Sequence, residues 1–243
     1  MRLHEVDTIA EVILQLETYI DYCIETDNRM GYFASLYCSV TKEVQKGIVT
    51  GRFEDGKRME ILDVHFANFF FKSTQEASDV WKVAFDSAKT SRYVLLQHLL
   101  LGMNAHINFD LALAVTKSVS EYDMPNLYHD YDEINSILIE QIDAMQNAVN
   151  RSWWPFKVLD FIALRFDEAV VGFSLIKARE SAWNFALKLQ RDSDNTTQNM
   201  MQELTLSYAQ QVQNPKGFLV VLTWLNHLFE PKSVTKLIQI IRN

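Results

Sequence analysis

Residues 97–110 read Gln97-His-Leu-Leu-Leu-Gly-Met-Asn-Ala-His-Ile-Asn-Phe-Asp110, and they place six polar side chains within the most apolar stretch of the chain. Burying such groups costs free energy unless each one finds a hydrogen-bond partner, a metal or a ligand. A helix that is lined all round by apolar and amide side chains is a central, buried one. The stretch therefore predicts a buried helix at the centre of the fold, with a site beside it.

Helical spacing arranges these polar residues in two stripes. One stripe carries amides that fall within about 40° of one another around the helix axis: Gln97, Asn104 and Asn108. The other stripe recurs every four residues and consists of His98, Gly102, His106 and Asp110. We expect Gly102 to leave open space beside the backbone, because glycine has no side chain.

The rest of the chain predicts further helices. Its 243 residues are 48% apolar and 22% charged, as in an ordinary folded protein, and seven glycines with four prolines are too few for many tight hairpins. No segment alternates with a period of two residues. We predict one all-α domain over residues 1–243, a bundle of about ten helices around a central helix at about 91–119. Before the central helix, we expect helices at 7–27, 32–49, 58–72 and 78–88. After it, we expect a long helix that follows a turn at 123–126, then helices at 156–165 and 167–190, one that ends at about 212, and two more at 218–229 and 233–241.

The charge and the distribution of apolar residues indicate which classes of partner this protein can bind. A net charge of −8 with scattered Lys and Arg argues against nucleic-acid binding, which needs a clustered basic surface. The start of the chain lacks a signal-like apolar core, and the apolar runs are short and interrupted. We expect a soluble, cytoplasmic protein with no membrane span. Its expected partner is a small molecule, and no oligomeric state is predicted.

The pair His106 and Asp110 lies one turn apart and could ligate a divalent transition metal. His98 lies roughly 12 Å from His106 along a straight helix, so the two histidines could share one ion only if the helix broke near Gly102. The motifs Glu-x-x-His and His-Glu-x-x-His are absent. Further ligands would come from other helices, where the candidates are Asp63, His65, Asp160, Asp167 and Glu180.

Two functions fit these patterns. In the first, the protein is a small-molecule enzyme in which His106 and Asp110 act as a general base pair or as metal ligands, with His98 as a third catalytic residue. The predicted ligand-binding residues are Asn104, Asn108, Gln97 and Arg179. In the alternative, the protein is a non-catalytic binding or interaction protein whose polar stripes form a structural hydrogen-bond network. Arg179 would then stack on Trp183 and pair with a carboxylate such as Asp160.

Four stretches carry a family resemblance: Tyr32-Phe-Ala-Ser-Leu-Tyr37, Arg58-Met-Glu-Ile-Leu-Asp-Val64, Phe66-Ala-Asn68 and His98 through Leu111. They resemble the bacterial and fungal domain-of-unknown-function family numbered five-nine-nine-five. The most specific part is Asn104-Ala-His-Ile-Asn-Phe-Asp-Leu111. The resemblance implies the domain limits and a bacterial protein, but it implies no activity. It also implies an apolar residue at position 65, which makes His65 a poor catalytic candidate.

Overall fold

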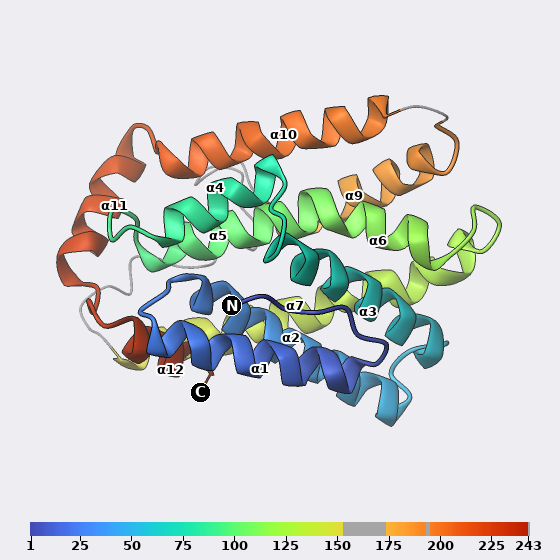
Figure 1. Cartoon of the computed structure of the whole chain (residues 1–243), viewed down its shortest axis with the longest axis horizontal. Coiled ribbons are helices and arrows are strands. Elements are labelled where there is room, and N and C mark those ends of the chain that lie inside the picture. Colours follow the sequence, from blue (N-terminus) through green and yellow to red (C-terminus); the bar gives the residue numbers. More distant parts are fainter. Residues whose placement is uncertain (153–173, 193–194, 243) are drawn as a thin grey trace.

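The segment with the two polar stripes runs as one continuous helical rod through the middle of the protein (Figure 1). It consists of α5 (Leu95–Ala105), a π-helical turn η1 (His106–Asp110) and α6 (Leu111–Ser118). By length and composition, Leu95–Ser118 could cross a membrane, but 89% of its most apolar window is buried inside the protein. The predicted central, buried helix is therefore confirmed.

The computed structural model describes residues 1–152, 174–192 and 195–242, and all regular elements in these ranges are helical. This confirms the predicted all-α bundle. The predicted helix at 156–165 and the first part of that at 167–190 lie outside the described residues. The helices around the central rod are α1 (Ile9–Glu25), α2 (Met30–Thr50), α3 (Gly56–Ser73), α4 (Asp79–Ala88), α7 (Met124–Ser152), α9 (Leu175–Leu189), α10 (Thr196–Gln213), α11 (Phe218–Phe229) and α12 (Val234–Arg242).

The surrounding helices cover the rod from different sides. In Figure 1, α10 follows one flank of α5 and α1 lies along the opposite edge of the bundle. Helix α2 contacts both α1 and α5. The last helix, α12, packs against α2 and α7, so the C-terminal end returns to the side of the N-terminal helix. Buried apolar side chains from all of these helices except α11 form one core together with those of α5, η1 and α6.

The central helix differs from its prediction in two respects. It begins at Leu95 rather than at residue 91, because the Glu230 carboxylate accepts the Leu95 backbone N–H at 2.9 Å and so caps the helix there. It also widens at His106–Asp110, where the N–H of Leu111 donates to the carbonyl of His106, five residues earlier. Local spacing at about 100° per residue predicts a regular α-helix and misses this turn.

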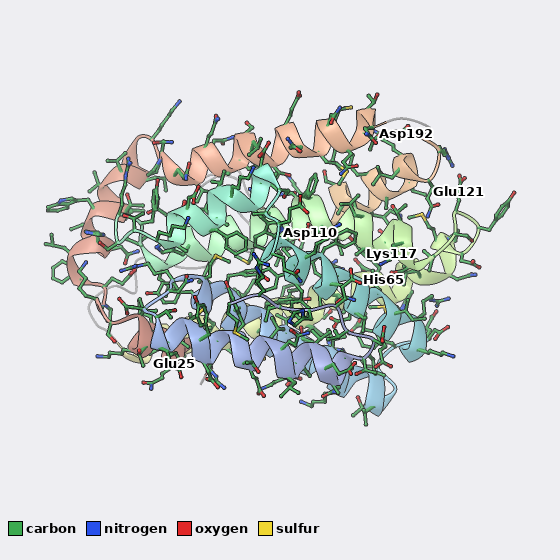
Figure 2. The ribbon with its side chains drawn as sticks, viewed as in Figure 1. Glu25, His65, Asp110, Lys117, Glu121 and Asp192 are labelled. Atoms are coloured by element: carbon green, nitrogen blue, oxygen red, sulfur yellow. The ribbon has the colours of Figure 1, made fainter. Side chains whose placement is uncertain are left out.

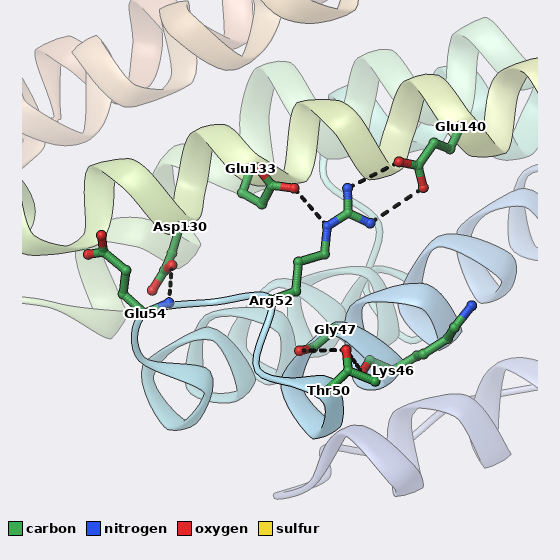
Figure 3. Close-up of polar contacts among 8 residues, drawn as sticks. All are labelled: Lys46, Gly47, Thr50, Arg52, Glu54, Asp130, Glu133 and Glu140. Atoms are coloured by element: carbon green, nitrogen blue, oxygen red, sulfur yellow. Dashed lines mark hydrogen bonds and ion pairs between the residues drawn. The ribbon is translucent and has the colours of Figure 1, made fainter.

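A polar network fixes α7 against the connection between α2 and α3. The guanidinium of Arg52 bridges Glu133 at 2.7 Å and Glu140 at 3.1 Å, as Figure 3 shows. The fully buried carboxylate of Asp130 accepts the backbone N–H of Glu54 at 2.7 Å and of Asp55 at 2.9 Å. These contacts hold in place three of the helices that surround the cavity described below.

Candidate functional site

The amide stripe connects the central helix to α10. The Gln97 side chain donates to the carbonyl of Val212 at 2.7 Å, and that of Asn104 donates to the carbonyl of Thr205 at 2.9 Å. Asn108 donates to the side-chain oxygen of Asn104 at 2.8 Å. None of the three amides lines the cavity described below. The three amide side chains are therefore engaged in hydrogen bonds within the protein, and a ligand contact by any of them stays a prediction.

Replacing Asn104 by Ala is expected to lower the free energy of unfolding by about 1–3 kcal/mol, because the carbonyl of Thr205 and the amide of Asn108 both lose a buried partner. Urea denaturation measures the loss. The matched control is Asn199→Ala, since Asn199 is exposed on α10. Equal stability of the two variants would contradict the anchoring role.

His98 lies apart from the other predicted catalytic residues. Its ring packs edge-on against Tyr32 and Tyr93, with centroids 5.8 and 6.1 Å away, and it is not part of the cavity lining. Burial lowers the pKa of His98 to about 4. The π-helical turn η1 begins at His106, so the helix between His98 and His106 is a regular α-helix and keeps the two histidines on separate turns. The structure therefore does not bring His98 to His106.

His106 and Asp110 form the buried pair that the spacing predicts. The two side chains are 3% and 4% exposed, and Nδ1 of His106 lies 3.0 Å from Oδ2 of Asp110. The indole N–H of Trp81 donates to the same Oδ2 at 2.9 Å. In Figure 2, Asp110 lies in the interior between the helices. We assign Nδ1–H of His106 as the second donor to this oxygen, which leaves the lone pair of Nε2 free to accept.

An aromatic cluster holds the His106 ring. Phe66 stacks on it in parallel, with ring centroids 3.5 Å apart, and Tyr37 lies edge-on at 4.7 Å. Phe33, Trp81 and Phe70 also lie against the ring, with centroids 5.7, 6.0 and 6.1 Å away. Removal from water lowers the pKa of His106 well below its usual value, so the imidazole is neutral at physiological pH. Burial raises the pKa of Asp110 well above its usual value, and the hydrogen bond from Trp81 opposes part of that shift by stabilising the carboxylate.

A cavity of about 80 Å³ lies beside His106. Its walls are mainly Leu, Val, Met, Ile and Phe side chains from the central helix, α2, α3 and α7. Four polar residues join them: Tyr37, Asp63, His106 and Arg179. In the part of the chain that the structure describes, three buried polar atoms of this lining have no hydrogen-bond partner: Tyr37 Oη, Asp63 Oδ2 and His106 Nε2.

Burial favours the protonated form of Asp63 at neutral pH. The residue is 9% exposed and lines a largely apolar cavity, and burial together with the nearby charge of Glu60 raises its pKa to about 8. Burial also raises the pKa of Tyr37 well above its usual value. Sequence reasoning considered Asp63 only as a metal ligand and did not propose Tyr37. The available signal was a lone carboxylate one turn before Phe66 on an apolar helix face.

Arg179 lies at the edge of this cavity but not in the predicted arrangement. Its guanidinium stacks over the ring of Tyr131 at 4.3 Å, and its Nε donates to the side chain of Asn135 at 2.7 Å. The predicted stacking on Trp183 is wrong, because the Trp183 ring packs against Tyr131 itself, 4.8 Å away. Asp160, the predicted partner, lies outside the described residues. A ligand contact by Arg179 stays a prediction.

The predicted metal site finds no support in the described ranges. No group of three or more His, Cys, Asp and Glu side chains there could hold an ion. Two of the proposed ligands, Asp160 and Asp167, lie outside those ranges. Nδ1 of His106 is engaged by Asp110, and Nδ1 of His65 lies 2.9 Å from the Ser118 hydroxyl.

The fold and the site define a helical-bundle protein with a partly polar cavity against its central helix. The chain belongs to the family of unknown function DUF5995, whose model matches residues 9–214. This range contains all the residues that line the cavity and ends before α11. No curated protein and no solved structure matches the chain.

Proposed function

We propose that this protein is a small-molecule enzyme whose active site is the cavity beside η1, with His106 and Asp110 as its general base pair. One observation carries the proposal: three buried polar atoms without a partner in the described residues line the same apolar cavity. Buried polar atoms in folded proteins nearly always have partners. A molecule bound in the cavity would supply them.

The pair is arranged for accepting a proton. Asp110 orients the ring of His106 through Nδ1 and would stabilise the imidazolium that forms when Nε2 takes a proton. Trp81 is a positioning residue, because its N–H fixes the carboxylate oxygen that His106 contacts. The lowered pKa of His106 keeps Nε2 free of a proton until a bound molecule supplies one.

Asp63 supplies the complementary acid. Two titratable groups whose environments move their pKa values in opposite directions are typical of an acid and base in one site. Asp63 holds its proton because burial raises its pKa to about 8, whereas burial keeps His106 neutral. The base would take a proton from one atom of the bound molecule while the acid gives one to another. The reaction class that follows is a proton transfer within one small molecule.

The structural alternative explains part of the molecule. Hydrogen bonds from Gln97, Asn104 and Asn108 account for the amide stripe without any ligand. The alternative leaves the unpartnered atoms around the cavity without a role, which favours the enzyme.

An activity screen tests the proposal. Purified protein is incubated with a soluble metabolite extract, and compounds that disappear or form are measured by mass spectrometry. We expect turnover by wild type and a fall of about 10²–10⁴-fold in Asp110→Asn, because the amide would donate to Nδ1 and place the proton on Nε2. The matched control is His129→Ala, since His129 is 71% exposed.

Nitrogen-15 NMR of the histidine ring provides a second measurement, independent of any substrate. Wild type should show the proton on Nδ1, and Asp110→Asn should show it on Nε2. Turnover of the same compound by Asp110→Asn at the wild-type rate, or a wild-type ring with its proton on Nε2, would contradict the general base.

A further inference from the structure

The cavity offers a specific set of hydrogen-bonding groups. Nε2 of His106 is an acceptor, because Nδ1 faces Asp110. The hydroxyl of Tyr37 and the protonated carboxyl of Asp63 are donors. Tyr37 and His106 are adjacent, with ring centroids 4.7 Å apart. Phe66, one turn after Asp63 on α3, stacks on the same histidine. Donors and acceptor therefore surround one small volume.

The charge of the lining also limits what can bind. Three of its four polar residues are uncharged at neutral pH: Tyr37, Asp63 and His106. The fourth, Arg179, stacks its guanidinium on Tyr131 and donates to Asn135. An anion would lie next to Asp63, where the apolar surroundings already disfavour the negative charge of the carboxylate. The same surroundings would disfavour the charge of the anion. A cation would find no ionised carboxylate among the described residues that line the cavity.

We propose that the molecule bound here is a small neutral alcohol, whose hydroxyl donates to Nε2 of His106 and accepts from Tyr37, while the carboxyl of Asp63 donates to a second acceptor atom of the same molecule. This inference rests on the proposed function and names its substrate class. A hydroxyl is the smallest group that both donates and accepts, so it satisfies groups of both kinds at once. The volume of about 80 Å³ is roughly half of a cavity that binds benzene, which favours an apolar body of about three or four carbon atoms.

Binding of four matched probes tests the class: 1-propanol, acetone, propionate and propylammonium. Binding is followed through the NMR signals of the methyl groups of Met103 and Ile107, which line the cavity. We expect millimolar binding of 1-propanol, because a ligand of four heavy atoms has little binding energy available. Acetone, which can only accept, should bind about 10-fold more weakly, since it leaves Nε2 without a donor. The two ions should bind more weakly still.

A conservative variant locates the contact. Tyr37→Phe removes only the hydroxyl and should weaken 1-propanol about 3- to 10-fold while leaving the fold intact. Tyr128→Phe is the matched control, because Tyr128 is exposed. Unchanged 1-propanol affinity in Tyr37→Phe would overturn the hydroxyl contact.

The outcomes separate this inference from the proposed function. Acetone or either ion binding as tightly as 1-propanol would overturn the alcohol class, while the cavity would still be a ligand site. Methyl signals that respond to none of the probes would show a cavity that holds only water, and would also overturn the alcohol class. The proposed function itself is tested separately, and it fails if either the metabolite screen or the histidine tautomer contradicts it.

Discussion

Replacing Asp63 by Asn should stabilise the protein strongly at alkaline pH and little at acidic pH. Burial raises the pKa of Asp63 in the folded protein from 3.8 to about 8. Below pH 4 the group is protonated in both the folded and the unfolded state. Between pH 4 and 8 unfolding releases the proton of Asp63, so the free energy of unfolding falls as the pH rises. Above pH 8 the folded protein carries the full cost of burying the ionised carboxylate. At about 1.4 kcal/mol per pKa unit, the cost of keeping Asp63 ionised in the folded protein is on the order of 6 kcal/mol at most.

Urea denaturation of wild type and Asp63→Asn at pH 5, 7 and 9 measures this effect. The control is Asp86→Asn, because the Asp86 side chain is 68% exposed and should show no comparable pH dependence. A stability difference between Asp63→Asn and wild type that is the same at pH 5 and pH 9 would show that Asp63 is already ionised. The acid in the proposed function would then be lost as well.

Replacing Gly102 by Ala is expected to destabilise the protein by about 1–3 kcal/mol or more. A Cβ at this position would lie 2.5 Å from Cγ and 2.8 Å from Cβ of Phe33. These Phe33 atoms are close to the backbone of α2 and cannot swing aside, so the two helices must separate. The gain of up to about 1 kcal/mol in helix propensity offsets only part of the loss. The predicted open space at Gly102 is therefore filled by Phe33.

Gly47→Ala is the matched comparison for Gly102→Ala. Its Cβ would approach the outer edge of the Phe53 ring at 2.8 Å, and that edge can move by rotation of the side chain. We expect a smaller loss in Gly47→Ala, measured by urea or thermal denaturation. A Gly102→Ala variant as stable as Gly47→Ala would mean that α2 and α5 can separate at little cost. Because Phe33 also contacts His106, the Gly102 variant should in addition shift the ring signals of that histidine.

Local sequence spacing was sufficient for much of the fold. Helical periodicity predicted the all-α bundle, and the interleaved polar and apolar residues of 97–110 predicted a buried central helix. The contact between His106 and Asp110 also follows from sequence, because side chains four residues apart share a helix face. The family membership was predicted from a resemblance carried by four short stretches between residues 32 and 111, and the family model confirms the membership.

Only the tertiary structure decided which of the polar residues form a site. It joins Trp81 to Asp110 and brings Tyr37 and Asp63 to the cavity beside His106, although these residues come from different helices. In the folded protein, the amide stripe forms hydrogen bonds with α10, and His98 packs against Tyr93, away from the cavity. Spacing along one helix fixes the direction of each side chain but not the helix that packs against it. That partner depends on how the apolar faces of the whole chain fit together, and so does the burial that keeps Asp63 protonated and His106 neutral.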